Sequence, residues 1–566
     1  MFDKILIANR GEIAVRVIRT CRRLGIRSVV IYSEVDREAM HVRLADEAVA
    51  CGGPSASESY LDSAGIVEIA RRVGADALHP GYGFLSENAD FAEATAAAGI
   101  RFIGPSPDVI RSMGDKIAAR ARMQAAGIRI VPGGEAIRDL DQARRSADQL
   151  GYPVLVKASA GGGGRGMRRA DQQSELEAAI EGAAREAETL FGNAAIYLEK
   201  RLIGARHIEI QLVADRRGKV LHLGERECSI QRRHQKLVEE APAFGMTDAL
   251  RLAMSETAVR VAEVVGYEGV GTCEFLLDRN GDFYFLEMNT RIQVEHPVTE
   301  AMTGLDLVEL QIRIAAGEPL PISQADVRLT GHAIETRIYA EDPENGFIPS
   351  PGPITGWLAP RGRGVRLDSG FEAGSTISTH YDPMIAKLIV SGRDRDEALT
   401  RLSAALEEFW IAGIRTGLPF LRRLVEAAAF KTGAYDIDFI DSEMSAPPNP
   451  LDAERRDWIL AAVGRRAALL ESGRVRHFRI TLPPSEAVVV EVLSSSNPIR
   501  VRLDDRVLEL ESIGEETNSP FETFRFGDIE RRITLVPRKR GGFDVGLRDR
   551  TLRVKCQPVG CGTQKS

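Results

Sequence analysis

The chain of 566 residues is too long for one hydrophobic core, and its length predicts three or four domains of ordinary size. With 44% hydrophobic and 27% charged residues, it has the composition of a globular protein. A net charge of -7 argues against a general nucleic-acid binder, and no apolar run approaches the roughly 18–20 residues that a membrane span needs. Six cysteines without a C-x-x-C pair fit a reducing compartment, so we expect a cytoplasmic protein of a bacterium, with an organelle matrix as the alternative.

The first hundred residues alternate between strand-like and helix-like segments. We expect strands over 4–8, 28–32 and 75–79, and helices over 12–24 and about 62–73. This alternation predicts a parallel sheet wrapped by helices. A dinucleotide site at the first turn is disfavoured, because that turn lacks G-x-G-x-x-G.

A smaller α/β unit is expected over about 131–201, and it contains a glycine-rich run, 161–166. A buried strand with Lys157 near its end precedes the run. Glycines let backbone N–H groups approach phosphate oxygens, and a loop without side chains can close as a lid. Because the lysine comes before the glycines, this is not the Walker arrangement. Taken alone, the glycines favour a flexible turn, but together with Lys157 and the acidic hairpin described next they favour a phosphate-binding loop.

Two acidic residues are predicted to face each other across a hairpin. Asn280 and Gly281 separate two apolar runs, and Asn-Gly is the strongest short-range signal for a two-residue turn. Such a turn places Glu274 opposite Glu287, with Asn289 on the same face. Facing carboxylates repel unless a cation or a proton intervenes, and a few oxygen ligands suit Mg²⁺. The alternative is a solvated face with two surface glutamates.

Two further segments are rich in charge. Residues 225–240 indicate either a solvated surface strand or the polar wall of an active site, and spacing does not decide between them. Arg291 and Glu295 lie four apart, and a guanidinium with a nearby carboxylate suits a planar anion such as bicarbonate and its base. A local ion pair between the two is the alternative that spacing alone favours.

The prolines of the segment 445–450 interrupt the pattern, and we place a domain boundary there. Beyond it we expect a helix over about 452–470 and then eight short strands. The strands are expected over 478–482, 487–493, 499–503, 507–513, 523–526, 529–536, 543–547 and 552–559. This succession predicts an antiparallel barrel packed around the helix.

Several of these segments closely resemble biotin carboxylase. They are Lys4–Ala14, His79–Asn88, the glycine-rich run, Gln231–Lys236 and Glu287–Pro297. The match covers about residues 1–445, and the tail is similar, more weakly, to the helix-in-barrel middle domain of acyl-CoA carboxylase α subunits. The resemblance implies an α/β chain with an ATP-grasp fold and four domains. They are a Rossmann-like parallel-sheet domain (1–113), an ATP-grasp domain (114–330, with a lid at about 131–201), a biotin carboxylase C-terminal domain (331–445) and a helix plus β-barrel docking domain (446–566).

The resemblance also implies roles for individual residues. In the implied ATP site, Lys116 and Lys157 bind the phosphates, and Gly163 and Gly164 belong to the lid. The hinge that recognises adenine consists of Glu199, Lys200, Arg201 and Leu202. The wall of the site is lined by His207, Gln231 and His234. The magnesium ligands, with Mn²⁺ as a possible substitute ion, are Glu274, Glu287 and Asn289. The bicarbonate cradle is Lys236, Arg291 and the Val294 backbone, with Glu295 as the base and Arg337 as the residue that stabilises the biotin enolate.

The implied activity is ATP-dependent carboxylation of biotin with bicarbonate, through carboxyphosphate. Family α subunits carry biotin on the lysine of a Met-Lys-Met motif, and this sequence has none. We therefore expect a biotin carrier protein in trans, a carboxyltransferase β subunit and an oligomer, with no nucleic-acid or membrane partner. Within the family, the sequence is slightly more similar to methylcrotonyl- and acetyl-type chains than to the propionyl type. A pyruvate carboxylase subunit is a further alternative. Outside the family, the alternatives are another ATP-grasp ligase, which joins a carboxylate to an amine, and an inactive scaffold.

Overall fold

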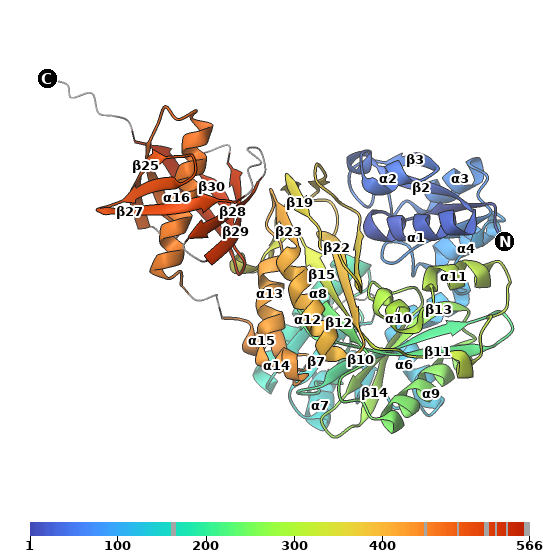
Figure 1. The fold of residues 1–566 in the computed structure, drawn as a ribbon. Coiled ribbons are helices and arrows are strands. Elements are labelled where there is room, and N and C mark those ends of the chain that lie inside the picture. Colours follow the sequence, from blue (N-terminus) through green and yellow to red (C-terminus); the bar gives the residue numbers. More distant parts are fainter. Residues whose placement is uncertain are drawn as a thin grey trace.

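The computed structural model describes residues 1–159, 166–446, 450–483, 486–513, 520–526, 529–538 and 541–559 (Figure 1). Gly163 and Gly164, expected in the lid, lie outside these residues. Within the described part of the chain, no helix has both the length and the apolar character that a membrane crossing needs. The expected mixed α/β architecture with a barrel at the carboxyl end is confirmed.

The amino-terminal region forms the predicted parallel sheet, with strand order β3-β2-β1-β4-β5. Its elements are β1 (Lys4–Ile7), α1 (Gly11–Leu24), β2 (Arg27–Ser33), α2 (Met40–Leu44), β3 (Glu47–Gly52), α3 (Ser63–Arg72), β4 (Ala77–His79), α4 (Ala89–Ala97), β5 (Arg101–Phe102) and α5 (Pro107–Gly114). Ile5 and Ile7 belong to the same buried cluster as Ile13 of α1, whereas Leu6 clusters with Phe91 of α4. The strand is a continuous apolar run because both faces of the sheet are covered.

A second, four-stranded sheet follows, with strand order β6-β9-β7-β8. Its region comprises α6 (Lys116–Ala125), β6 (Gly133–Ala136), α7 (Leu140–Leu150), β7 (Val154–Ala158), β8 (Met167–Ala170), α8 (Gln173–Phe191) and β9 (Ile196–Lys200). This is the small α/β unit that the sequence predicted.

The largest sheet has eight strands in the order β14-β13-β10-β11-β12-β15-β22-β20. Its strands are β10 (Arg206–Ala214), β11 (Val220–Arg232), β12 (Gln235–Ala241), β13 (Gly269–Leu277), β14 (Phe283–Asn289), β15 (His332–Tyr339), β20 (Val365–Ser369) and β22 (Met384–Gly392). The helices of this region are α9 (Asp248–Val265), α10 (His296–Thr303), α11 (Leu307–Ala315), α12 (Arg395–Glu408), α13 (Leu418–Glu426), α14 (Ala428–Thr432) and α15 (Phe439–Glu443). Because β12 pairs with β15, the sheet continues across the boundary expected at residue 330.

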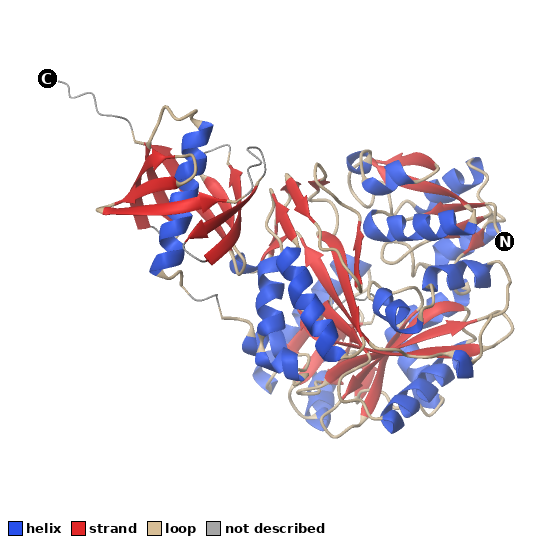
Figure 2. Ribbon diagram, viewed as in Figure 1, coloured by secondary structure: helices blue, strands red, loops and turns tan. Residues whose placement is uncertain are grey.

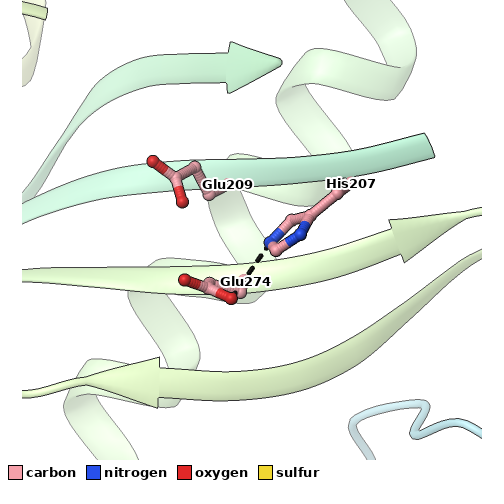
Figure 3. A group of neighbouring side chains, drawn as sticks. All are labelled: His207, Glu209 and Glu274. Carbon is pink, nitrogen blue, oxygen red and sulfur yellow. Dashed lines mark ion pairs between the residues drawn. The ribbon is translucent and has the colours of Figure 1, made fainter. Parts of the chain in front are cut away.

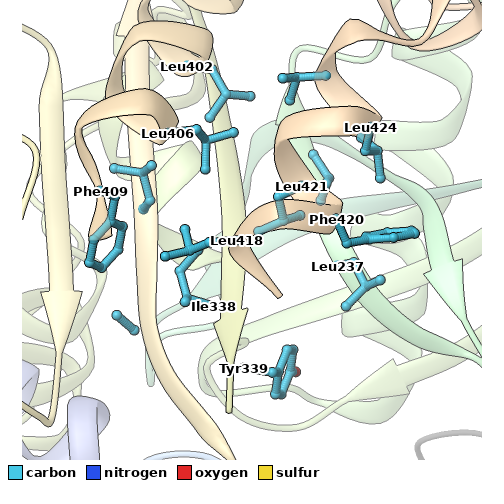
Figure 4. Close-up of a cluster of buried hydrophobic side chains, with 14 of the residues drawn as sticks. Leu237, Ile338, Tyr339, Leu402, Leu406, Phe409, Leu418, Phe420, Leu421 and Leu424 are labelled. Atoms are coloured by element: carbon cyan, nitrogen blue, oxygen red, sulfur yellow. The ribbon is translucent and has the colours of Figure 1, made fainter. Parts of the chain in front are cut away.

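Helices α12 and α13 cover the carboxyl-terminal part of that sheet. Figure 4 shows Leu402 and Leu406 of α12 and Leu421 of α13 in one cluster with Ile338 of β15. Burying each such side chain contributes about 1.5–3 kcal/mol, so this cluster holds β15 rigidly in place. The strand carries Arg337, whose neighbour Ile338 is fully buried.

The predicted barrel is confirmed: eight antiparallel strands form a closed barrel, and helix α16 (Ala453–Leu470) packs against these strands (Figure 2). The strands are β24 (His477–Leu482), β25 (Glu486–Ser494), β26 (Ile499–Leu503), β27 (Arg506–Ser512), β28 (Phe521–Phe526), β29 (Ile529–Pro537), β30 (Phe543–Gly546) and β31 (Thr551–Pro558). Trp458 and Ile459 of the helix share a buried cluster with Phe478 and Val490 of the strands. The barrel meets the rest of the protein where Arg422 of α13 donates to the Arg548 carbonyl oxygen at 3.1 Å.

The buried ring of His79, at the end of β4, leads to a prediction of how the stability of the protein depends on pH. It is fully buried, its Nδ1 accepts the Gly81 N–H at 3.0 Å, and burial lowers its pKa to about 4. In the unfolded chain the ring titrates near its ordinary pKa, so the unfolded state binds the extra proton first as the pH falls. This contribution to stability is therefore complete above about pH 6.5 and is lost towards pH 4, with a loss of about 2 kcal/mol by pH 4.5.

His79→Asn removes the titrating ring and keeps an oxygen that can accept the same N–H. Urea unfolding at pH 7 and pH 4.5 should show a smaller fall in unfolding free energy for the variant than for the natural chain. Equal falls would mean that His79 does not contribute to the pH dependence.

Candidate active site

Strands β13 and β14 form the predicted hairpin, and Glu274 faces Glu287 as expected. The prediction of a two-residue turn is wrong. β13 ends at Leu277 and β14 begins at Phe283, so the connection between them is longer. Nearer the turn the register is shifted by one, and Leu286 is the extra residue of a β-bulge that restores it before Glu287. Glu274 and Glu287 therefore face each other because the longer turn shifts the register by one residue and the β-bulge shifts it back.

Glu274 is the most densely contacted carboxylate of this hairpin. Its Oε1 accepts from Lys236 Nζ at 3.0 Å, Asn289 Nδ2 at 2.9 Å and Gln293 Nε2 at 2.9 Å, and its Oε2 lies 3.0 Å from His207 Nε2. Burial alone would raise the pKa of Glu274, but Lys236 and His207 hold it well below its usual range. With 6% of its surface exposed, Glu274 contradicts the alternative of surface glutamates.

Lys236 offsets the negative charge of several buried carboxylates. Its ammonium nitrogen lies 2.5 Å from Glu209, 3.0 Å from Glu274 and 2.6 Å from Glu295. Glu209 also pairs with the buried Arg226. The repulsion expected between the hairpin glutamates is thus relieved in part by cations of the protein itself, and it is no separate argument for a metal ion.

Glu209 is a site residue that sequence reasoning missed. His207, Glu209 and Glu274 bring ligand atoms within 4.8 Å of one another, a spacing that a metal ion could bridge (Figure 3). Glu209 follows His207 by two on β10, so both side chains lie on one face of the strand. A lone glutamate between Ile208 and Ile210 is the sequence signal that could have identified it.

Glu295 and Arg337 form the next part of the site. Arg337 Nη2 donates to Glu295 Oε2 at 2.9 Å, and its Nε donates to Glu239 Oε1 at 2.6 Å. Glu295 is fully buried; burial opposes its ionisation, but Lys236 and Arg337 hold its pKa below the usual range. Burial raises the pKa of Glu239 to about 7. Residues 225–240 therefore contribute an active-site wall, not a solvated strand.

Arg291 does not form the local ion pair that spacing favoured. Its Nε donates to Glu87 Oε2 at 2.9 Å and its Nη2 to Asn289 Oδ1 at 2.9 Å, whereas Glu295 binds Lys236 and Arg337. Glu87 comes from the amino-terminal region, about two hundred positions away, so spacing could not have indicated it. The arginine side chain is 19% exposed and borders the same group of residues.

Both lysines expected at the ATP phosphates lie beside carboxylates. Lys116 Nζ, at the start of α6, lies 2.7 Å from Glu287 Oε2. Lys157, near the end of β7, pairs with Glu199, which also lies 2.5 Å from Arg120 Nη1. The backbone N–H of Lys116 donates to the Ser159 carbonyl oxygen at 3.1 Å and thereby connects the two lysine-bearing segments.

The expected hinge residues lie at the end of β9 and directly after it. The Glu199 side chain is buried against its cations, so its carboxylate faces Lys157 and Arg120. Lys200 Nζ donates to the Gly151 carbonyl oxygen at 2.7 Å, Arg201 pairs with Asp438, and Leu202 is half-buried. The charged side chains of Glu199, Lys200 and Arg201 are therefore all engaged in contacts within the protein.

His207 and His234 have different surroundings. The His207 ring nitrogen Nδ1 lies 2.7 Å from Gln231 Nε2 inside the site. His234 is exposed in the two-residue turn between β11 and β12, where Arg233 and His234 have φ of 49° and 66°. Two successive positive φ values fit the type I′ turn that joins twisted strands. The turn therefore places the His234 imidazole at the border of the site. The alternating pattern of a β-strand alone would not have predicted this position.

Three family models match successive parts of the chain. They are the biotin carboxylase N-terminal domain over residues 1–110, the ATP-binding domain of the carbamoyl-phosphate synthase L chain over 115–323, and the biotin carboxylase C-terminal domain over 335–442. The second match covers the four-stranded sheet and the strands that carry Lys236 and Glu274, and the third begins within β15, which carries Arg337.

Curated relatives agree with these matches. Biotin carboxylase 2 of Bacillus subtilis is 53% identical over 445 residues, which covers 78% of this chain and 100% of the relative. The mitochondrial methylcrotonoyl-CoA carboxylase subunit alpha of Oryza sativa subsp. japonica is 52% identical over 442 residues, covering 78% of this chain and 60% of the relative.

Solved structures show the same fold. The biotin carboxylase domain dimer of Hydrogenobacter thermophilus 2-oxoglutarate carboxylase, in complex with MgADP, ADP and bicarbonate, has a TM-score of 0.78 and 47% identity over 79% of this chain and 100% of that chain. A biotin carboxylase complex from Campylobacter jejuni has a TM-score of 0.76 and 45% identity over 78% of this chain and 99% of that chain. The chain therefore belongs to the biotin carboxylase family of ATP-grasp enzymes.

Proposed function

We propose that the chain uses ATP to carboxylate biotin with bicarbonate and serves as the biotin carboxylase component of a larger carboxylase. One observation carries the proposal most directly. A fully buried carboxylate, Glu295, is held between Lys236 and Arg337, with Arg291 nearby on the same loop. Cations that surround a buried base can hold a small planar anion next to that base.

In the first step, Glu295 takes the proton of bicarbonate. The neighbouring cations keep Glu295 ionised, which makes it available as a base but also a weak one. A bicarbonate anion that shares Lys236 and Arg291 places a like charge beside Glu295, and this raises the affinity of the carboxylate for a proton. Binding of the substrate thus strengthens the base that acts on it.

The deprotonated bicarbonate then attacks the γ-phosphate of ATP, giving carboxyphosphate and ADP. Lys116 and Lys157 would hold the phosphates, and Glu274, Glu287 and Asn289 would hold magnesium. These three side chains lie on the facing strands β13 and β14, and their oxygen donors suit a hard ion. When bound, magnesium supplies positive charge for the phosphoryl group in transfer.

In the second step, carboxyphosphate releases CO₂ and phosphate within the site. The phosphate removes the ureido proton of biotin, and the resulting enolate captures CO₂ and forms the new carbon–nitrogen bond. Arg337 is rigidly held by Glu239 and Glu295 and can stabilise the enolate oxygen without rearrangement. Exclusion of water matters because hydrolysis would destroy carboxyphosphate.

Biotin would arrive on a carrier protein in trans, a carboxyltransferase β subunit would use the carboxylated carrier, and the assembly would be an oligomer in the cytoplasm. The three family matches and the separate barrel support domain boundaries near residues 113, 330 and 445.

The purified chain with ATP, magnesium and radiolabelled bicarbonate tests this function. We expect release of ADP that requires bicarbonate and rises with free biotin, together with labelled carboxybiotin. ATP cleavage that needs a carboxylate and an amine, but not bicarbonate, would indicate another ATP-grasp ligase. Failure to bind ATP at all would indicate a scaffold.

Lys236→Met should be strongly destabilising. It leaves the carboxylates of Glu209, Glu274 and Glu295 without their shared cation, and loss of one partner of a buried ion pair costs about 3–5 kcal/mol. Lys116→Met is the matched control, because its contact with Glu287 is partly exposed and its loss costs about 1 kcal/mol or less. Urea unfolding of both variants measures the difference, and similar losses would show that Lys236 has no special role in compensating charge.

Arg337→Gln should separate the two chemical steps. Nucleotide affinity should stay within about threefold of the natural chain, whereas carboxylation of free biotin should fall more than about 100-fold. Arg313→Gln, which removes a partly exposed arginine on α11, is the control and should retain both properties. Parallel losses of nucleotide affinity and carboxylation in the Arg337 variant would assign Arg337 a structural role instead.

A further inference from the structure

Lys387 is a fully buried lysine that the mechanism above does not use. It lies on β22, and its Nζ donates to the Val294 carbonyl oxygen at 2.7 Å and lies 3.2 Å from Glu12 Oε1. Glu12 belongs to the first turn of α1, whereas Val294 precedes Glu295 in the loop before α10. One ammonium group thus connects three regions that are far apart in the sequence.

The packing around Lys387 leaves the lysine little freedom. Tyr82 donates its hydroxyl to Glu12, so that carboxylate is held from a second side. Gly370, at the end of β20, approaches the start of α1 so closely that an added Cβ would lie 2.6 Å from the Glu12 backbone nitrogen. The backbone directly after β20 and the backbone at the start of α1 are therefore in direct contact beside Lys387.

The hydrogen bond to Val294 acts on the peptide that carries the base. The Val294 carbonyl oxygen and the Glu295 N–H belong to one planar peptide group, so a donor fixed on the oxygen fixes the orientation of that group. The carboxylate of Glu295 is held at the other end by Lys236 and Arg337. Glu295 is thereby held at both its backbone and its side chain.

The register of the sheet explains how this double hold arises. Lys387 is the direct cross-strand partner of Arg337 in the β15–β22 pair. One pair position thus supplies both a donor to the carboxylate of Glu295 and a donor to its peptide. Burying a lysine completely is costly, and a charge-assisted hydrogen bond to a carbonyl is stronger than a neutral one.

We propose that Lys387 is a positioning residue that orients the Val294–Glu295 peptide and so sets the direction of Glu295 toward bicarbonate. The assignment rests on the proposed function of Glu295 as the base. A residue that merely paired with Glu12 would stabilise the fold, but it would not affect the use of bicarbonate more than the binding of nucleotide.

Lys387→Met alone leaves the buried Glu12 carboxylate without its cation, so the Lys387→Met, Glu12→Gln double variant removes the two charges of this ion pair together. We expect the double variant to retain a Tm close to that of the natural chain and nucleotide affinity within about twofold. Its kcat/KM for bicarbonate should fall at least about 30-fold, and amide hydrogen exchange should rise in the peptide that contains residues 290–297.

Lys4→Met is the matched control. Lys4 is also buried, and it also contacts one carboxylate, Glu47 at 2.7 Å, and one carbonyl oxygen, that of Val73 at 2.9 Å, but it lies in the amino-terminal sheet. This variant should lose stability and keep its kcat/KM for bicarbonate.

Unchanged exchange in 290–297 of the double variant would overturn the inference whether or not the chain turns over. Recovery of both Tm and bicarbonate kinetics in that variant would also overturn it, since Lys387 would then only balance Glu12. Absence of bicarbonate-dependent turnover in the natural chain would instead reject the proposed function, and the exchange measurement would still decide whether Lys387 positions the peptide.

Discussion

The contact of one ammonium group, that of Lys236, with three buried carboxylates is the interaction on which the site depends. Each carboxylate comes from a different segment: Glu209 from β10, Glu274 from β13 and Glu295 from the start of α10. Without the lysine these segments would bring like charges together in a region of low dielectric, where repulsion is strong. The same contact keeps Glu295 ionised, so the stability of the site and its chemistry share one cause.

A single sheet positions these groups. Strands β10, β12 and β13 carry Glu209, Lys236 and Glu274, and β15 and β22 add Arg337 and Lys387. Because β12 and β15 are hydrogen-bonded neighbours, Lys236 and Arg337 belong to one sheet. Glu295, at the start of α10, is held against this sheet by its contacts with Lys236 and Arg337.

The sequence allowed prediction of features that follow from local patterns. Alternating apolar runs gave the parallel sheet and the eight barrel strands, and the Asn280–Gly281 signal gave the facing of Glu274 and Glu287, although the turn itself is longer. Partners brought together by tertiary folding could not be read from spacing. Arg291 pairs with Glu87, more than two hundred positions away, and not with its near neighbour Glu295. The nucleotide and biotin roles came from resemblance, because no local pattern encodes them.

The fate of the bicarbonate oxygens tests the central claim most directly. Bicarbonate labelled with oxygen-18 can be supplied with ATP and biotin, and the isotope content of the released phosphate measured by mass spectrometry. If deprotonated bicarbonate attacks the γ-phosphate and carboxyphosphate then releases CO₂, one labelled oxygen must remain in each phosphate ion. Phosphate without the label would show that water or another nucleophile attacked ATP, and it would contradict the role proposed for Glu295 and the cations around it.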